Sequence, residues 1–247
     1  MKLSQIINYP LGLLGWKIVR KDRLKFINNS DIQQDKQFLA IYRQIEKYTL
    51  VPFERCYALY QAVQYIIRNN IQGDFAECGV WRGGSCMLIA RTLQASGITN
   101  RKIYLYDTFA GMPEPGPHDG ETEKDEWQRL QATPGRMCFA PIEDVKSNLA
   151  STGYPAGNFI LVKGKVEETI PGTVPAAISL LRLDTDWYES TRHELLHLYP
   201  LLVKSGVLIV DDYGAWQGAR KAVDEYFSAF PAVFLGRIDY TGRIVIK

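Results

Sequence analysis

Four aspartates follow two apolar runs, and their types and spacing suggest a metal site. The first run ends in Asp184 and Asp186, and the second ends in Asp211 and Asp212. If both runs are neighbouring parallel strands of an open α/β sheet, their carboxyl ends meet at one edge, which is where ligands bind. Carboxylates crowded there repel one another unless a cation, a proton or a hydrogen-bonding ligand compensates them. A hard divalent ion suits these donors best, although each aspartate alone is as readily explained as a solvated turn residue.

A glycine-rich turn earlier in the chain points to a nucleotide-type ligand. Gly79, Gly83 and Gly84 have the spacing Gly-x-x-x-Gly-Gly, and Ser85 can begin a helix whose free N–H groups face the loop. This spacing differs from the dinucleotide fingerprint and from the P-loop, and a turn that merely packs a helix on a strand would look similar. Asp107 ends the next expected strand, where an acid can accept hydrogen bonds from ribose hydroxyls.

These side chains require a sheet that brings several strand ends to one edge. Apolar runs alternate with helix-like patterns, beginning with a helix over residues 53–68, which is typical of a doubly wound α/β fold. Only three residues join the last two runs, too few for a parallel crossover, so an antiparallel hairpin is expected. The expected strands are 74–80, 102–107, 159–162, 177–184, 207–211, 233–239 and 243–247.

The helix after Asp186 has its own expected limits. Thr191 and Glu194 have the spacing of a capping box, and Gly206 lies just past the expected end. Pro200 removes a backbone donor, so a bend is expected near it. The apolar stripe that packs on the sheet is Leu195, Leu198, Tyr199 and Leu202.

Length and composition set the outer limits. The 247 residues suffice for one large α/β domain, placed at 51–247, and the net charge of +2 indicates no nucleic-acid partner. Four cysteines without a C-x-x-C pair indicate neither a zinc site nor a disulfide framework, so a cytoplasmic protein is expected. Residues 1–50 are expected to form an N-terminal arm and a helix near 35–47, and the stretch up to Val19 is too apolar to lie in water. It is too interrupted for a signal peptide or membrane span, so it should pack on the domain or mediate a homo-oligomer.

Four segments resemble, in the same order, the macrocin O-methyltransferase (TylF/MycF) family. They are 77–85, 107–113, 181–191 and 210–213, and the resemblance covers roughly residues 50–230. Members of that family use S-adenosylmethionine and magnesium to methylate hydroxyl groups, best known on deoxysugars of macrolide and aminocoumarin antibiotics. The resemblance implies a Rossmann-like, mostly parallel seven-stranded sheet with a C-terminal antiparallel hairpin.

Carried over by position, the resemblance assigns a role to each motif. Asp184, Asp211 and Asp212 would hold magnesium or manganese, and Asp184 would also be the base, with Asp186 as its rival. The residues that would bind S-adenosylmethionine are Glu77, Gly79, Val80, Trp81, Arg82, Gly83, Ser85, Asp107, Thr108 and Phe109. The residues that would contact the acceptor are Asp186, Trp187, Tyr188 and Tyr213.

The expected acceptor is a small molecule with vicinal hydroxyls. A sugar of a glycosylated natural product is favoured by the resemblance, and a catechol or other polyphenol is the alternative, since both present flat apolar faces with hydroxyls. Trp187 is bulkier than its counterpart in familiar family members and could reshape the acceptor side. Segment 114–139 matches the family poorly. Because it is rich in breakers and acids, it is expected to be a movable loop that closes over the acceptor.

Other functions stay open at this level. A non-catalytic S-adenosylmethionine-binding module or a nicotinamide-dependent protein could share the fold. The first would give Asp184, Asp211 and Asp212 no role, and the second would require the G-x-G-x-x-G dinucleotide motif, which the glycine-rich turn does not match. His193, Glu194 and His197 satisfy the H-E-x-x-H pattern of zinc hydrolases, although the apolar stripe and the expected cap explain the same residues. His118 is a candidate second base, but a histidine in such a loop is more often solvated.

Overall fold

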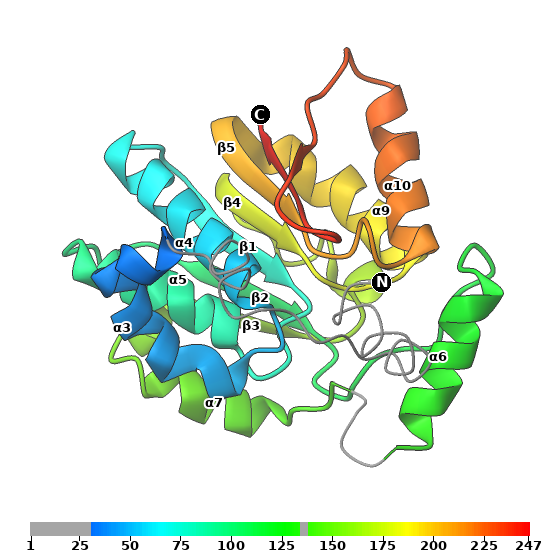
Figure 1. Cartoon of the computed structure of the whole chain (residues 1–247), viewed down its shortest axis with the longest axis horizontal. Helices are drawn as coiled ribbons and strands as arrows, with labels where there is room; N and C mark the ends of the chain where they lie inside the picture. Colours follow the sequence, from blue (N-terminus) through cyan, green and yellow to red (C-terminus); the bar gives the residue numbers. More distant parts are fainter. Residues whose placement is uncertain (1–30, 134–137) are drawn as a thin grey trace, which may run out of the picture. The chain divides into compact units, whose positions relative to one another are not determined.

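The computed structural model describes residues 31–133 and 138–247 (Figure 1). The chain divides into two units, residues 1–39 and 40–247. Within the first unit, Asp35 Oδ1 accepts a hydrogen bond of 2.9 Å from the Phe38 amide at the start of α3 (Lys36–Ile45). The helix expected near residues 35–47 is therefore confirmed, whereas the predicted packing of the N-terminal arm falls largely outside the described residues.

The second unit is built on a seven-stranded sheet in the order β3-β2-β1-β4-β5-β7-β6. Its strands are β1 Asp74–Cys78, β2 Ile103–Asp107, β3 Phe159–Lys163, β4 Ile178–Leu183, β5 Leu202–Val210, β6 Gly236–Arg237 and β7 Arg243–Ile246. β1 to β5 pair in parallel, and β7 is antiparallel to both β5 and β6. The predicted doubly wound sheet with a C-terminal hairpin is confirmed.

Helices cover both faces of the sheet (Figure 1). One face carries α4 (Phe53–Arg68), α5 (Gly84–Ala95) and α7 (Ile142–Ala150), and the other carries α8 (Val166–Thr169), α9 (Tyr188–Leu198) and α10 (Gln217–Ser228). Every residue of β4 is buried, as expected for a parallel strand covered on both sides. Within the described ranges, no helix is long and apolar enough to cross a membrane.

Two strands differ most from the prediction, and β1 also ends at Cys78, two residues before its predicted end. The second strand of the acidic edge begins at Leu202, which had been placed in the helical stripe, because a 3-10 turn over Tyr199–Leu201 ends the helical run. Pro200 lies in that turn, and Leu202 instead pairs with Ile178 of β4. β6 is limited to Gly236–Arg237, much shorter than the predicted 233–239, because only two residues pair with β7.

The predicted capping box of the helix after Asp186 is also wrong. Helix α9 begins at Tyr188, so Glu194 lies inside it, fully buried, and its Oε1 accepts a hydrogen bond of 2.9 Å from Thr185 Oγ1. The first amide of the helix, that of Tyr188, is instead capped by Asp119 Oδ1 at 2.9 Å. A local spacing rule missed a cap that comes from a distant loop.

Candidate active site

The three predicted metal ligands meet at the carboxyl edge of the sheet. β4 and β5 are adjacent and parallel, with Leu183 opposite Val210, so Asp184 and Asp211 leave the sheet side by side. One carboxylate oxygen from each of Asp184, Asp211 and Asp212 lies within 4.8 Å of the others. Across residues 31–133 and 138–247, this is the one group of three or more His, Cys, Asp or Glu side chains arranged to hold a metal ion.

A buried arginine that the sequence analysis did not identify lies among these acids. Arg182 Nη1 is 2.5 Å from Glu77 Oε1 and 2.7 Å from Asp184 Oδ2, and its Nη2 is 2.5 Å from Asp211 Oδ1. Its side chain is 1% exposed. The available signal was a lone arginine in an apolar strand, two residues before an acid and therefore on the same strand face.

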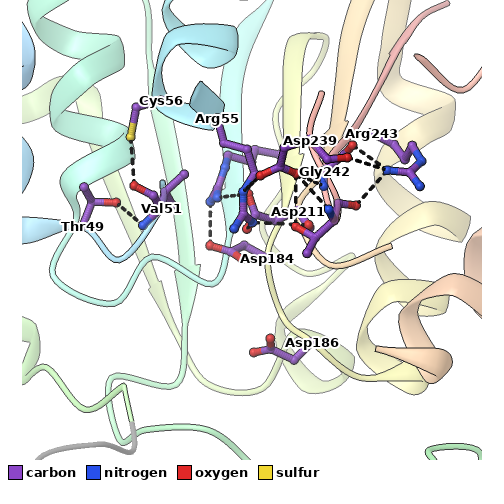
Figure 2. Close-up of polar contacts among 12 residues, drawn as sticks. Thr49, Val51, Arg55, Cys56, Asp184, Asp186, Asp211, Asp239, Gly242 and Arg243 are labelled. Atoms are coloured by element: carbon purple, nitrogen blue, oxygen red, sulfur yellow. Dashed lines mark hydrogen bonds and ion pairs between the residues drawn. The ribbon is translucent and has the colours of Figure 1, made fainter. Parts of the chain in front are cut away.

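A second arginine holds the other oxygen of Asp211. Arg55, on α4, makes an ion pair with Asp211 Oδ2, and its Nε lies 3.0 Å from Asp239 Oδ2. Asp239 Oδ1 in turn accepts hydrogen bonds from the amides of Thr241 and Gly242, at 2.9 and 2.7 Å. Figure 2 shows this chain of contacts running from α4 through Asp211 to the turn of the C-terminal hairpin. The hairpin thus helps to fix a predicted metal ligand.

Burial and mutual repulsion disfavour the ionised forms of these carboxyl groups. Burial raises the pKa of Asp211 to about 6 although Arg182 opposes the shift. Burial, with the nearby Asp186 and Asp184, raises the pKa of Asp212 well above its ordinary value. Carboxylate oxygens are the donors that magnesium and manganese prefer, so the residues present fit such an ion.

Asp186 lies apart from the arginine contacts, as Figure 2 shows. Its backbone is left-handed, with φ of 70°, which is uncommon for a residue other than glycine and is often found at functional sites. Trp216 Nε1 donates a hydrogen bond of 2.7 Å to its Oδ1. Burial, followed by the charge of Asp184, raises the pKa of Asp186 to about 7. The turn after β4 therefore presents a second carboxyl group in a setting unlike that of Asp184.

A cavity of about 250 Å³ extends from this edge over the glycine-rich turn. It is lined by seven of the predicted cofactor residues, Glu77, Gly79, Val80, Trp81, Ser85, Asp107 and Thr108. It is also lined by Asp184, Asp186 and Asp211. Arg82, Gly83 and Phe109 belong to the same two loops but are not among the lining residues. The cofactor loop and the acidic edge thus share one cavity.

Asp107 organises the loops around this cavity. Its Oδ2 accepts hydrogen bonds from the amides of Val80 and Trp81, at 2.7 and 3.0 Å, and its Oδ1 accepts one of 2.7 Å from the amide of Phe109. Trp81 and Phe109 both have positive φ, 44° and 50°. The carboxylate therefore holds two strained loops together, a structural role that the sequence analysis did not anticipate.

Three of the four predicted acceptor residues lie outside the cavity lining. Trp187 Nε1 donates a hydrogen bond of 2.9 Å to the Pro113 carbonyl. The hydroxyl of Tyr188 donates to Glu225 at 2.6 Å, and that of Tyr213 donates to Asp224 at 2.8 Å. Among the four, only Asp186 belongs to the described lining.

The wall opposite the acids was missed by the sequence analysis. Tyr48, Thr49, Leu50 and Val51 line the cavity beside the glycine-rich turn. A β-carbon on Gly84 would lie only 2.5 Å from the Tyr48 carbonyl oxygen, so this residue type allows the wall to approach the loop. No pattern within residues 48–51 indicated such a role, because the contact is made by backbone. Cys138 and Lys165 are further lining residues that were not predicted.

Segment 114–139 contains a helix, α6 (Glu121–Gln131), that is anchored on the domain. Asp119 caps α9, and Glu123 Oε1 accepts a hydrogen bond of 2.8 Å from the Gln217 amide at the start of α10. His118 packs against the Tyr188 ring, with 4.5 Å between ring centroids, and does not line the cavity. The closure predicted for this segment stays a prediction.

The H-E-x-x-H pattern has a structural explanation. His193 Nε2 lies 2.9 Å from the Ile170 carbonyl oxygen, and Glu194 is buried in the interior of α9. These residues are not part of the metal-capable group found in the described ranges. The zinc interpretation therefore has no geometric support.

Comparisons with known proteins identify relatives of this chain. A model of the family described as macrocin-O-methyltransferase (TylF) matches residues 12–243. The 8-demethyl-8-(2,3-dimethoxy-alpha-L-rhamnosyl)-tetracenomycin-C 4'-O-methyltransferase of Streptomyces olivaceus is 32% identical over 81% of this chain and 76% of its own length. Demethyldecarbamoylnovobiocin O-methyltransferase of Streptomyces niveus is 33% identical over 74% and 69%, respectively. Mycinamicin III 3''-O-methyltransferase of Micromonospora griseorubida is 29% identical over 72% and 70%.

Solved structures agree with these relatives. The O-methyltransferase NovP superposes with a TM-score of 0.74 at 31% identity, covering 81% of this chain and 82% of that one. A calicheamicin methyltransferase, at 17% identity and a TM-score of 0.58, shares the fold over 87% of this chain and 92% of its own. The chain belongs to the macrocin O-methyltransferase family and is an S-adenosylmethionine-dependent O-methyltransferase.

Proposed function

We propose that this enzyme methylates a hydroxyl of a sugar on a glycosylated natural product, with magnesium or manganese held by Asp184, Asp211 and Asp212. The observation that carries the metal part is the set of three carboxylates with oxygens within 4.8 Å of one another, next to the cofactor cavity. When bound there, such an ion would orient a vicinal diol and lower the pKa of its hydroxyl.

The acceptor class is supported by the named substrates of the relatives. One relative acts on a rhamnosyl-tetracenomycin and another on mycinamicin III. A sugar hydroxyl beside a second hydroxyl or a methoxy group offers two oxygens to a metal held at the acidic edge. A catechol offers the same pair of oxygens, so it is the comparison compound for the test below.

The glycine-rich loop and Asp107 position the cofactor. The methyl group leaves a sulfonium by in-line displacement, so the main task of the protein is to hold the hydroxyl oxygen against the methyl carbon. Such positioning alone can supply about 7–11 kcal/mol of the barrier reduction. Residues 48–51 and the acidic edge, which both line the cavity, would limit the approach of water to the reacting atoms.

We assign the base to Asp186 in preference to Asp184. Arg182 holds Asp184 Oδ2 at 2.7 Å, and the same carboxyl group belongs to the metal-capable set. Asp186 lines the cavity and is held at Oδ1 by Trp216. A carboxylate anchored at one oxygen can accept the hydroxyl proton at the other, Oδ2.

A methyl-transfer screen tests this function. The enzyme would be incubated with S-adenosylmethionine labelled in its methyl group and with matched panels of glycosides and catechols, each with magnesium and with excess EDTA. We expect labelled product from glycosides only when magnesium is present. Full turnover in EDTA would remove the metal from the proposal, and labelling of catechols alone would reassign the acceptor.

A further inference from the structure

We propose that Arg182 is a positioning residue that couples the cofactor site to the metal site. This inference rests on the proposed function, because it takes Asp184 and Asp211 as metal ligands. Arg182 itself is not among the residues that line the cavity. It acts by fixing three carboxylates that come from three adjacent strands, β1, β4 and β5.

The geometry of the guanidinium makes the connection. Nη1 donates to Glu77 Oε1 at 2.5 Å and to Asp184 Oδ2 at 2.7 Å, so one nitrogen joins a residue of the cofactor loop to a residue of the acidic edge. Nη2 reaches Asp211 Oδ1 at 2.5 Å. Arg182 and Glu77 are each 1% exposed and Asp211 is 6% exposed, so water cannot substitute for the contacts among these three, whereas Asp184 is 24% exposed. Charged groups buried to this degree interact strongly and in a fixed geometry.

Glu77 is held from both sides, so movement at one end reaches the other. Its Oε2 accepts a hydrogen bond of 2.8 Å from Cys86 Sγ, in the helix that follows the glycine-rich turn. Glu77 also lines the cavity together with Gly79. A change in how Arg182 is shared among the acids therefore alters the position of a group in the cofactor wall and of the helix behind it.

Metal binding would change that sharing. Without a cation, Arg182 is divided among Glu77, Asp184 and Asp211. A divalent cation at Asp184 and Asp211 would satisfy much of their negative charge, leaving the guanidinium to hold Glu77 in one position. The cofactor wall would then be better ordered before the cofactor enters, so each ligand should favour the other. Coupling of this kind must be reciprocal.

Lysine cannot replace this arginine. The guanidinium is a rigid planar fork with five N–H donors, whereas an ammonium is a single point of charge on a flexible stem. Arg182→Lys keeps the positive charge among the acids. The single ammonium cannot donate hydrogen bonds to Glu77, Asp184 and Asp211 in the geometry that the guanidinium provides. The substitution therefore separates the geometric role from simple neutralisation of charge.

Calorimetry on the wild-type protein and two variants tests the coupling. S-adenosylhomocysteine, which lacks the sulfonium charge, is the cofactor analogue. Its dissociation constant is measured with saturating magnesium and in EDTA. The dissociation constant of magnesium is then measured with and without S-adenosylhomocysteine. We expect magnesium to tighten S-adenosylhomocysteine binding by a factor of about 5–150, the usual range for coupled sites, and the reverse titration to give the same factor. In Arg182→Lys the factor by which each ligand tightens the other should fall to about one. Magnesium binding should also weaken, because substitution of a residue that holds a metal ligand typically lowers metal affinity.

Arg101→Lys is the matched control. Arg101 lies at the opposite end of the same strands, where its Nη1 donates to the Ile71 carbonyl at 3.1 Å and its Nη2 to Ser179 Oγ at 2.8 Å. Its replacement should lower the melting temperature while leaving the coupling factor at the wild-type value. Loss of coupling in this control would show that general loosening of the sheet is sufficient, and it would overturn the specific role of Arg182.

The remaining outcomes separate this inference from the proposed function. A wild-type factor in Arg182→Lys, or a factor of one in a wild-type enzyme that binds magnesium and turns over, overturns the coupling and leaves the function standing. Absence of magnesium binding together with full turnover in EDTA removes the metal and the coupling together. If Arg182→Lys does not fold, Glu77→Gln is used in its place, because this substitution weakens only the contact between Arg182 and residue 77. The coupling factor of Glu77→Gln should move toward one, and an unchanged coupling factor contradicts the coupling.

Discussion

Gly79 lies against the backbone of Asp184, so closely that a β-carbon at position 79 would be 1.9 Å from the Asp184 carbonyl oxygen. Gly79 also has a positive φ of 81°. Gly79 follows β1 and Asp184 follows β4, and these two strands are neighbours in the sheet. The cofactor turn and the acidic edge are thus in direct backbone contact, and only glycine fits between them.

Gly79→Ala should therefore damage both stability and cofactor binding. Left-handed backbone costs a residue with a side chain about 1–2 kcal/mol, and forcing a methyl group into packed backbone adds about 1–3 kcal/mol. We expect the free energy of unfolding, measured by urea denaturation, to fall by more than about 2 kcal/mol, with weaker S-adenosylhomocysteine binding. Gly97→Ala is the control, since Gly97 has a φ of 74° with nothing within 4 Å of the added carbon. Equal losses in the two variants would contradict the steric argument.

Substitution of the two acids after β4 should separate metal binding from proton transfer. Asp186→Asn is expected to lower kcat by about 10²–10⁴-fold, the usual contribution of a general base, with a smaller loss of magnesium affinity than in Asp184→Asn. Asp184→Asn is expected to weaken magnesium binding directly. Calorimetry with magnesium and single-turnover rates at saturating acceptor would measure the two effects.

The reverse pattern would return the base role to Asp184. That outcome consists of high turnover in Asp186→Asn together with normal magnesium affinity but very low kcat in Asp184→Asn. Asp144→Asn, on the exposed surface of α7, serves as the control for loss of a carboxylate and should leave both quantities unchanged.

Asp107→Ala should weaken cofactor binding without affecting the metal. The carboxylate accepts three backbone hydrogen bonds of 2.7 to 3.0 Å that fix both loops at the cavity. Hydrogen bonds to a charged group contribute about 1.5–3 kcal/mol each to the folded arrangement, so their loss should disorder the two loops of the cavity and weaken S-adenosylhomocysteine binding, measured by calorimetry. Asp74→Ala, at the other end of β1, is the control. A matching loss of magnesium affinity in Asp107→Ala would show that the two sites are not separable at this residue.

The sheet could be predicted because its signals are local and repeated. Apolar runs of strand length and the three-residue connection before β7 are visible in the sequence and were sufficient for the parallel core and the hairpin. The errors arose where a distant contact overrides a local rule. The start of α9 is set by Asp119, and the limits of β6 are set by what β7 can pair with.

The meeting of the aspartates at one sheet edge could be predicted for a similar reason, whereas the side chains that contact them could not. Strand ends in a parallel sheet meet at one edge, which brings Asp184 and Asp211 together whatever the other details. The partners of these acids come from elsewhere. Arg55 is on α4, and Glu77 reaches Arg182 across a strand pair. Apart from the lone arginine two residues before Asp184, these contacts depend on the packing of side chains, and no pattern in the sequence specifies them.

Glu194, which is not one of the proposed metal ligands, supplies a pH-dependent prediction. It is fully buried in α9, and burial raises its pKa well above the ordinary value of 4.5, although the hydrogen bond from Thr185 opposes the shift. A carboxyl group with such a raised pKa keeps its proton in the folded protein when the unfolded chain has already ionised. The free energy of unfolding must then fall as pH rises above about 4.5.

Glu194→Gln removes this ionisation and nearly preserves the shape of the side chain. Below pH 4.5 the acid is protonated in both states of the wild type, so the stability difference between wild type and variant should be constant. Above that value the difference should shift in favour of the variant by about 1.4 kcal/mol per pH unit, until the pH exceeds the pKa of the folded state. Urea denaturation at a series of pH values from 4 to about 8 would measure the slope. Glu143→Gln, at an exposed position of α7, is the control for loss of a carboxyl group, and a slope for Glu194→Gln no steeper than that of the control would contradict the raised pKa of Glu194.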